Sequence, residues 1–355
     1  MSRLSVRSQL RTRFGVICAL ALSPILLVPA LAAPAQAAVP DVFGYVLATS
    51  TGAVVPSGTT PAATTVTHTG LGVYDVLFPG QAGKGVAHVT AVNPGPVWCQ
   101  IASYAPSGPD ETVRVLCFKA SGGAIDSGFS AIYDSSTGLA PGPGVFGYVS
   151  ATVPGGLSTT YNSVGAPNSV VHGSTGHWQV TLAGLSTASG LAGSWQVTAL
   201  NKIPSHCKIM SWTSGPSQVA QVTCYDPTGA FFDTPFNLSF QSLRSLYGAV
   251  NPPKAFGYFF SGIPAGATPT NYNNPLGGSA NTLAGAGPWL VTFPQLAALP
   301  DDIQVTAEGQ SPDFCNLNTN WTHSGADTLV RDVVCYTPAG AISNSQFLIS
   351  DNTIA

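Results

Sequence analysis

The chain has 355 residues, of which 12 are Lys or Arg and 15 are Asp or Glu, so its formal net charge is −3. Charged residues make up only 8% of the chain, against about a quarter in an average soluble protein. This sparse and slightly acidic charge excludes the basic footprint of a nucleic-acid-binding protein and argues against docking on anionic lipid.

The first 37 residues have the pattern of a secretory signal peptide. Four arginines lie within the first 13 residues, and an apolar run over residues 16–31 leads to the small-x-small sequence Ala35-Gln36-Ala37. A membrane anchor is the alternative, but Pro24 and Pro29 interrupt the run, which is shorter than the roughly 20 residues that a span requires. We predict cleavage after Ala37, a secreted protein and no transmembrane segment in the mature chain. Processing leaves eight basic against 15 acidic residues, a net charge of −7.

Three copies of one pattern follow the predicted cleavage site. Phe-Gly-Tyr occurs at residues 43–45, 146–148 and 256–258, and Val-Thr-Ala at 89–91, 197–199 and 305–307, a step of 108 for the second motif. A repeat of about 105 residues is long enough to bury a core of its own. Gly- and Pro-rich segments at 135–144 and 248–254 separate the copies. We predict domains over 38–138, 139–248 and 249–355, arranged either as a compact pseudo-threefold unit or as an extended string.

Each copy has the pattern of consecutive β-strands. In the first copy, Tyr74, Val76 and Phe78 alternate with residues that face outward, and this period of two indicates a strand with one buried face. Further strands are expected at 43–48, 64–69, 86–92, 100–104, 112–118 and 129–133. About seven short strands per copy predict an all-β protein of three tandem antiparallel β-sandwich-like domains. A weak helical pattern occurs only near Leu243–Tyr247.

Six cysteines remain after processing, two in each copy, because Cys18 lies in the signal peptide. An even number of cysteines in a secreted chain indicates disulfides, and the repetition selects one pairing out of the fifteen possible. We predict one disulfide within each domain, namely Cys99–Cys117, Cys207–Cys224 and Cys315–Cys335. Zinc is the competing hypothesis, but the chain has no Cys-x-x-Cys spacing and no histidine at a recurring ligand distance, so we predict no metal site.

The order of these motifs resembles that of tandem modules in secreted proteins of Gram-positive actinobacteria. It consists of Phe-Gly-Tyr, an aromatic-x-Val-x-Phe-Pro-Gly segment as in Tyr74–Gly80, Val-Thr-Ala, a cysteine and a Cys-aromatic pair. The resemblance covers most of residues 40–355, although the third copy has Gln295 where the glycine would stand. It implies no activity and assigns no functional residue.

The repetition separates residues that the fold needs from residues that chemistry would need. His68 and His172 each lie six residues before an aromatic residue, but Leu283 takes that place in the third copy. Asp126 and Asp233 follow the second cysteine by nine residues, where the third copy has Asn344. Asn accepts a hydrogen bond but does not transfer a proton at neutral pH, so we interpret these positions as structural and expect the aspartates to close turns. We predict no catalytic residue and no cofactor.

One large ring per copy lies close to the first cysteine. These rings are Tyr104, Trp212 and Trp321, and they could either stack on sugars or pack over the disulfides. We select them as candidate ligand-binding residues. We expect an exported, non-catalytic binding or structural surface protein, with an extracellular glycan or surface molecule as partner. The alternative is a secreted carbohydrate-active or other hydrolase with a site between domains. The sequence leaves the oligomeric state open.

The cysteine pairing makes a simple prediction. Thiol titration of the unreduced, denatured mature protein should find essentially no free thiol, because all six cysteines are paired. Peptide mapping should then recover three disulfide-linked peptides, each from one copy. A peptide that joins cysteines of two copies would contradict the assignment.

Overall fold

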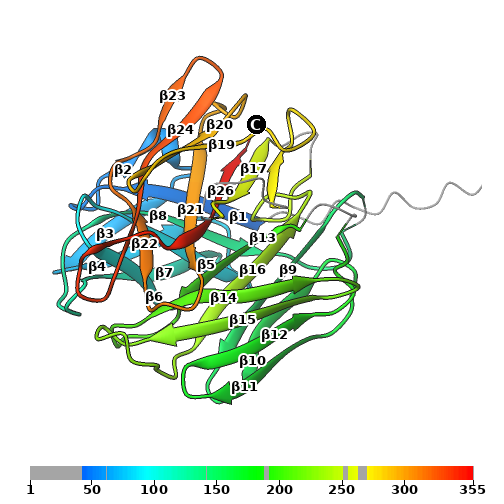
Figure 1. The fold of residues 1–355 in the computed structure, drawn as a ribbon, viewed down its shortest axis with the longest axis horizontal. Helices are drawn as coiled ribbons and strands as arrows, with labels where there is room; N and C mark the ends of the chain where they lie inside the picture. The colour runs from blue at the N-terminus through cyan, green and yellow to red at the C-terminus, as the bar shows by residue number, and fades with distance from the viewer. Residues whose placement is uncertain are drawn as a thin grey trace, which may run out of the picture. The chain divides into compact units, whose positions relative to one another are not determined.

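A computed structural model describes residues 42–60, 62–140, 142–187, 192–250, 255–262 and 270–354. The described residues belong to one compact unit, Ala37–Ala355. The signal peptide and its cleavage site lie outside the described residues. The prediction of an all-β fold with three tandem sandwich-like domains is confirmed, and Figure 1 shows the first domain in blue to teal, the second in green and the third in yellow to red.

The first repeat folds into two antiparallel four-stranded sheets. The inner sheet has the order β5-β8-β1-β2, and the outer sheet has the order β3-β4-β7-β6. A short 3-10 helix, η1 (Pro56–Gly58), follows β2. The strands are β1 (Val42–Ala48), β2 (Val54–Val55), β3 (Thr65–Gly70), β4 (Val73–Phe78), β5 (Val86–Val92), β6 (Val97–Ser107), β7 (Asp110–Lys119) and β8 (Gly128–Ser135).

The second repeat has the same topology, with β10-β9-β16-β13 as its inner sheet and β11-β12-β15-β14 as its outer sheet. Its strands are β9 (Val145–Thr152), β10 (Gly156–Asn162), β11 (Asn168–Ser174), β12 (His177–Leu182), β13 (Ser194–Ala199), β14 (His206–Ser214), β15 (Gln218–Tyr225) and β16 (Phe236–Ser242).

In the third repeat, the inner sheet is β21-β26-β17-β18 and the outer sheet is β19-β20-β24-β22, with β23 and β25 also paired to β24. The strands are β17 (Phe256–Phe260), β18 (Asn271–Asn273), β19 (Thr282–Gly285), β20 (Trp289–Phe293), β21 (Asp301–Glu308), β22 (Phe314–Leu317), β23 (Thr322–Ser324), β24 (Asp327–Tyr336), β25 (Ile342–Ser343) and β26 (Gln346–Thr353). The weak helical pattern at 243–247 was misleading, because this segment forms bends and a turn in which Leu243 has a φ of 54°.

The alternating residues close a separate core inside each sandwich. Tyr74, Val76 and Phe78 of β4 are fully buried together with Val113 and Val115 of β7, as the period of two predicts. Equivalent clusters form around Trp178 and Val180 in the second repeat and around Val291 and Phe293 in the third. Burying each such large side chain contributes about 1.5–3 kcal/mol, so each repeat has a core of its own.

Each predicted disulfide is confirmed. Cys99–Cys117, Cys207–Cys224 and Cys315–Cys335 each join directly opposite residues of two neighbouring antiparallel strands of an outer sheet, with Cα atoms about 4 Å apart. The pairs lie where the outer sheets approach the next repeat.

The three sandwiches are joined head to tail into a closed cycle. The amide of Asn201 donates to the carbonyl of Ile101 at 2.9 Å, and that of Gly309 donates to Ile209 at 3.0 Å. The cycle closes because Asn93, in the first repeat, donates to Leu317 in the third at 2.7 Å. Both donors and acceptors recur at steps of 108 residues, so the repeats have equivalent contacts around a pseudo-threefold axis.

Three threonine hydroxyls bridge the repeats at the centre of this cycle, where β5, β13 and β21 contact one another. The amides of Val89, Val197 and Val305 each donate to a threonine of a neighbouring repeat, at 3.4, 3.0 and 2.8 Å respectively; the acceptors are Thr198, Thr306 and Thr90. Each hydroxyl also contacts a side chain two residues before the threonine of another repeat, namely His88, Gln196 and Gln304. These polar groups are buried, so each repeat supplies partners that its neighbour requires.

A second set of buried polar side chains reaches across each junction. Gln100 donates to the carbonyl of Ile203 at 2.9 Å, and Lys208 donates to that of Ser311 at 2.8 Å. Asn316 completes the set by donating to Gly95 at 2.8 Å. All three donors are fully buried and occupy equivalent strand positions. Each one connects the outer sheet of its own repeat to the loop before β14, β22 or β6 of a neighbouring repeat.

We call the linked hydroxyls of Thr90, Thr198 and Thr306 the threonine ring. Removing one of these hydroxyls should destabilise the protein. Thr306→Val should lower the free energy of unfolding by about 2 kcal/mol, because it leaves the amide of Val197 and Oε1 of Gln196 without a buried partner. The isosteric control Thr67→Val, at an exposed position of β3, should change stability by less than about 0.5 kcal/mol. Urea denaturation measures both; equal effects would show that the ring does not hold the repeats together.

Candidate functional site

The predicted ligand-binding rings lie at the junctions between repeats. Tyr104, at the outer part of β6, is half-buried and donates its hydroxyl to Oδ1 of Asn237 in the second repeat at 3.2 Å. Its ring meets Tyr133 edge-on, with the ring centroids 6.1 Å apart. Burial raises the pKa of Tyr104 to about 12, so its hydroxyl remains protonated at neutral pH.

The other two rings occupy the corresponding places at the next junctions. Trp212 packs edge-on against Phe260 of the third repeat at 5.0 Å. Trp321 is 6% exposed, donates its indole N–H to Oδ1 of Asp301 at 2.8 Å, and lies against Gly58 of the first repeat. Because each ring belongs to a different junction, the three do not form one common stacking face.

A cavity of about 390 Å³ lies between the first and second repeats and is lined by Tyr104. Trp212 and Trp321 line neither this cavity nor the second one described below. The remaining lining combines hydroxyl groups, small residues and two charged side chains: Gly83, Lys84, Ala102, Ser103, Pro106, Glu111, Ser158, Thr159 and Leu200. We call this space the junction cavity. Its size and its mixture of apolar surface with a few polar groups are typical of small-molecule sites.

Glu111 is the chemically distinctive residue of the junction cavity. It begins the buried face of β7 and is fully buried. Its Oε2 accepts one long hydrogen bond, 3.4 Å, from the amide of Gly83, and Oε1 accepts none. Burial raises the pKa of Glu111 to about 7, against the opposing effects of Gly83 and the Tyr133 hydroxyl. The carboxyl group therefore has one acceptor oxygen that the protein does not satisfy with a well-formed hydrogen bond.

Sequence reasoning did not select Glu111, although a signal was present. Glu111, Val113, Val115 and Cys117 are two residues apart in sequence and point to the same face of the strand. A glutamate in phase with three core residues is predicted to be buried, and a buried carboxyl group without a partner is unusual. What the sequence could not show is the neighbouring repeat that closes a cavity over it.

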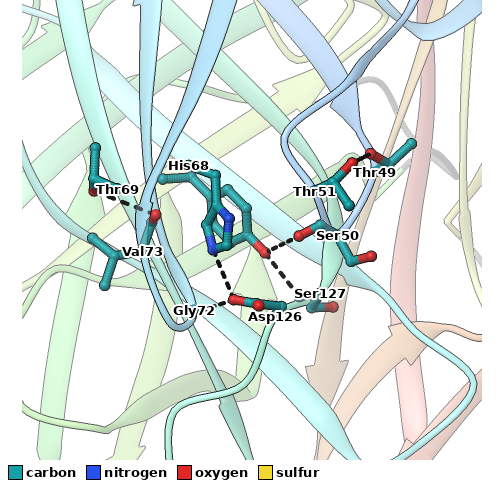
Figure 2. A network of polar contacts seen from close by, with 10 residues as sticks. Thr49, Ser50, Thr51, His68, Thr69, Gly72, Val73, Asp126 and Ser127 are labelled. Carbon is teal, nitrogen blue, oxygen red and sulfur yellow. Dashed lines mark hydrogen bonds and ion pairs between the residues drawn. The ribbon is translucent and has the colours of Figure 1, made fainter.

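The His-Asp pairs hold turns in place, as expected. Figure 2 shows Nε2 of His68 2.8 Å from Oδ1 of Asp126, which also accepts from the amide of Gly72 at 2.7 Å. The bond from Gly72 is the main cause of the lowered pKa of Asp126. In the same network, the Tyr74 hydroxyl donates to Ser50 and accepts from the amide of Ser127. The contacts join the β3–β4 turn to the segment before β8.

The second repeat keeps this arrangement, with His172 2.9 Å from Asp233 and the amide of Gly176 donating to the same oxygen. The prediction that both aspartates close turns is thus confirmed.

A smaller cavity of about 40 Å³ lies at the pseudo-threefold axis. Trp98, His206 and Phe314 come together there, with ring centroids 5.1–5.5 Å apart, next to the first cysteine of each repeat. Burial lowers the pKa of His206 to about 4, and it lowers that of His88 near the same axis to about 3. Both histidines are therefore neutral packing residues at physiological pH.

The third repeat contains further buried carboxyl groups. Asp302 is fully buried and accepts from the Ser130 hydroxyl of the first repeat at 2.6 Å. Burial raises the pKa values of Asp302 and Glu308 to about 7 and also raises those of Asp301 and Asp351. Within the described ranges, no group of three or more His, Cys, Asp or Glu side chains is placed to hold a metal ion.

No family model, curated protein or solved structure matches this chain. Among the residues that the structure describes, none of the helices has the length and apolar character needed to cross a membrane.

The buried carboxyl groups predict that the protein is more stable in mild acid than at neutral pH. Glu111, Asp302, Glu308 and Asp351 keep their protons in the native state at pH values where the unfolded chain, with pKa values near 4, has released them. The free energy of unfolding therefore falls as pH rises between about 4 and 7. The two buried histidines act in the opposite direction below about pH 6.5, but four carboxyl groups outweigh them.

Urea midpoints measured at pH 7.5, 6.5 and 5.5 should accordingly increase in that order. The neutral variants Asp302→Asn and Glu308→Gln should reduce the slope. A midpoint that decreases steadily from pH 7.5 to 5.5 would show that the buried carboxyl groups do not control the pH dependence.

Proposed function

We propose that the protein is an exported, non-catalytic binding protein that recognises a glycan unit in the junction cavity. The observation that carries this proposal is the presence of an aromatic ring, several hydroxyl groups and an unpartnered carboxyl oxygen around one space of about 390 Å³. A sugar presents an apolar ring face together with hydroxyl donors and acceptors. The tyrosine ring can pack against the apolar face of the sugar, and the surrounding hydroxyl and carboxyl groups can form hydrogen bonds with its hydroxyl groups.

The construction of the cavity supports binding by a preformed site. Tyr104 is held by Asn237 from the second repeat, while Ser158 belongs to β10 and Ser103 to β6. Residues from two separate sandwiches are therefore positioned by the junction between the first and second repeats. A preformed site binds with a smaller loss of side-chain entropy than a surface that must order on contact.

The hydrolase alternative places its chemistry in the same cavity. A glutamic acid whose pKa is near 7 is suited to general-acid catalysis, and this favours the alternative. Glycoside hydrolysis usually requires a second carboxylate about 5–9.5 Å away. The described lining of the cavity contains Glu111 as its one carboxylate, so binding is the function that we favour.

Retention of the protein on insoluble cell-wall polysaccharides, followed by calorimetry with soluble oligosaccharides, tests the proposal. Tyr104→Ala should weaken binding at least tenfold, because it removes the ring that lines the cavity. Trp212→Ala is the matched control, since this ring occupies the next junction and does not line the cavity. Loss of binding only in Trp212→Ala would locate recognition elsewhere, and release of reducing ends from the polysaccharide would favour the hydrolase.

A further inference from the structure

The three repeats provide an internal comparison for Glu111. In β7 it pairs with Phe78, and the residues in the same register position are Gln218, paired with Leu182, and Thr328, paired with Phe293. All three side chains are fully buried. The fold therefore accepts a neutral residue at this position, and the carboxyl group is a feature of the first repeat alone.

Gln218 shows what the fold does with a neutral amide at this place. Its Nε2 donates to the carbonyl of Leu185 at 2.7 Å, and its Oε1 accepts from the Ser214 hydroxyl at 2.9 Å. Glu111 has the long contact from Gly83 and the nearby hydroxyl of Tyr133, but its Oε1 has no well-formed hydrogen bond. A carboxyl group in this position is thus less well satisfied by the protein than an amide is.

A buried carboxylate costs more free energy than a buried amide, although it accepts a hydrogen bond from a ligand hydroxyl more strongly than an amide does. The advantage of the carboxylate over the amide is largest for a positively charged donor, because the attraction between opposite full charges grows in the low dielectric of a cavity. The carboxyl group that separates Glu111 from its counterparts is therefore most useful for recognising a cation.

We infer that Glu111 determines the specificity of the junction cavity and selects a saccharide unit that carries a protonated amine. This inference rests on the proposed function and names its ligand class. The Oε1 atom accepts from the ligand ammonium, while Tyr104 provides the wall against which the sugar ring lies. An acetylated amine, which is neutral, forms no ion pair and binds more weakly.

The surroundings of Glu111 are compatible with one added positive charge. Tyr104 of β6 and Tyr133 of β8 face it as neutral phenols, because burial raises the pKa values of both. Asp134, next to Tyr133, adds negative charge that favours a cation. The neighbouring Asp110 is occupied by the amide of Gly80. Lys84 also lines the cavity, but its side chain is exposed and its charge is screened by solvent.

The test compares two sets of probes of equal length, glucosamine oligosaccharides and N-acetylglucosamine oligosaccharides, by calorimetry at pH 7.5, where Glu111, with a pKa of about 7, is mostly ionised. The wild-type protein should bind the amine form at least tenfold more tightly. Glu111→Gln and Glu111→Thr, which introduce the residues of the other two repeats, should bring this ratio to about one while the acetylated probes still bind. Glu308→Gln, a buried glutamate at the next junction, is the matched control and should retain the preference.

The outcomes separate the inference from the proposed function. If the wild type binds both probe sets with equal affinity, or if Glu111→Gln keeps a tenfold preference, the inference is wrong and glycan recognition stands. If neither probe set binds the wild type or any variant, the proposed function fails for this sugar class and the inference fails with it. Thermal unfolding of each variant confirms that altered binding does not reflect a loss of fold.

Discussion

The buried edges of three sheets impose the condition on which the rest of this structure depends. β5, β13 and β21 meet at the centre, where an unpaired amide would cost about 1–3 kcal/mol. One amide on each edge is satisfied by a hydroxyl from another repeat, through Thr90, Thr198 and Thr306, and β5 and β21 also pair in parallel with β22 and β14 of neighbouring repeats. Because these partners come from a different repeat in every case, no repeat satisfies its own inner edge. Each sandwich has a core of its own, to which another repeat adds Leu348 in the second and Leu47 in the third, and the three share one polar centre.

The same closure explains why functional groups gather between the repeats rather than on one of them. Equivalent positions face equivalent junctions, so Gln100, Lys208 and Asn316 can differ in chemistry and still reach the same loop carbonyls. The junction tolerates such differences as long as buried donors find acceptors. Glu111 departs from this pattern, since its protein partners leave one oxygen unused. Because the fold does not need a carboxyl group at this position, we propose that Glu111 takes part in ligand recognition.

Regular patterns made much of the fold predictable. Tyr74, Val76 and Phe78 alternate because a strand exposes opposite faces in turn, and the paired cysteines recur because each repeat staples the same two strands. Short strands escaped prediction, since β2 consists of only Val54 and Val55 and carries no alternation. The segment at 243–247 has apolar spacing that suggests a helix, but local turn geometry at Leu243 prevails. Tyr104 was selected for its aromatic ring. Glu111 was not selected, because its significance depends on the residues of the second repeat that close the junction cavity.

The amino-acid sequence by itself determined the strand content, the number of repeats and the cysteine pairing, because these depend on local periodicity and on spacing within one copy. Tertiary structure alone decided that the third repeat returns to the first through Leu317 and Asn93, and that the first two repeats enclose a cavity. Residues of different repeats, far apart in the sequence, make these contacts, and their meeting depends on how buried polar groups are shared between sheets. The spacing of residues within one strand does not indicate which polar groups of other sheets will lie next to it. The candidate site can therefore be identified only from the junctions in the folded protein.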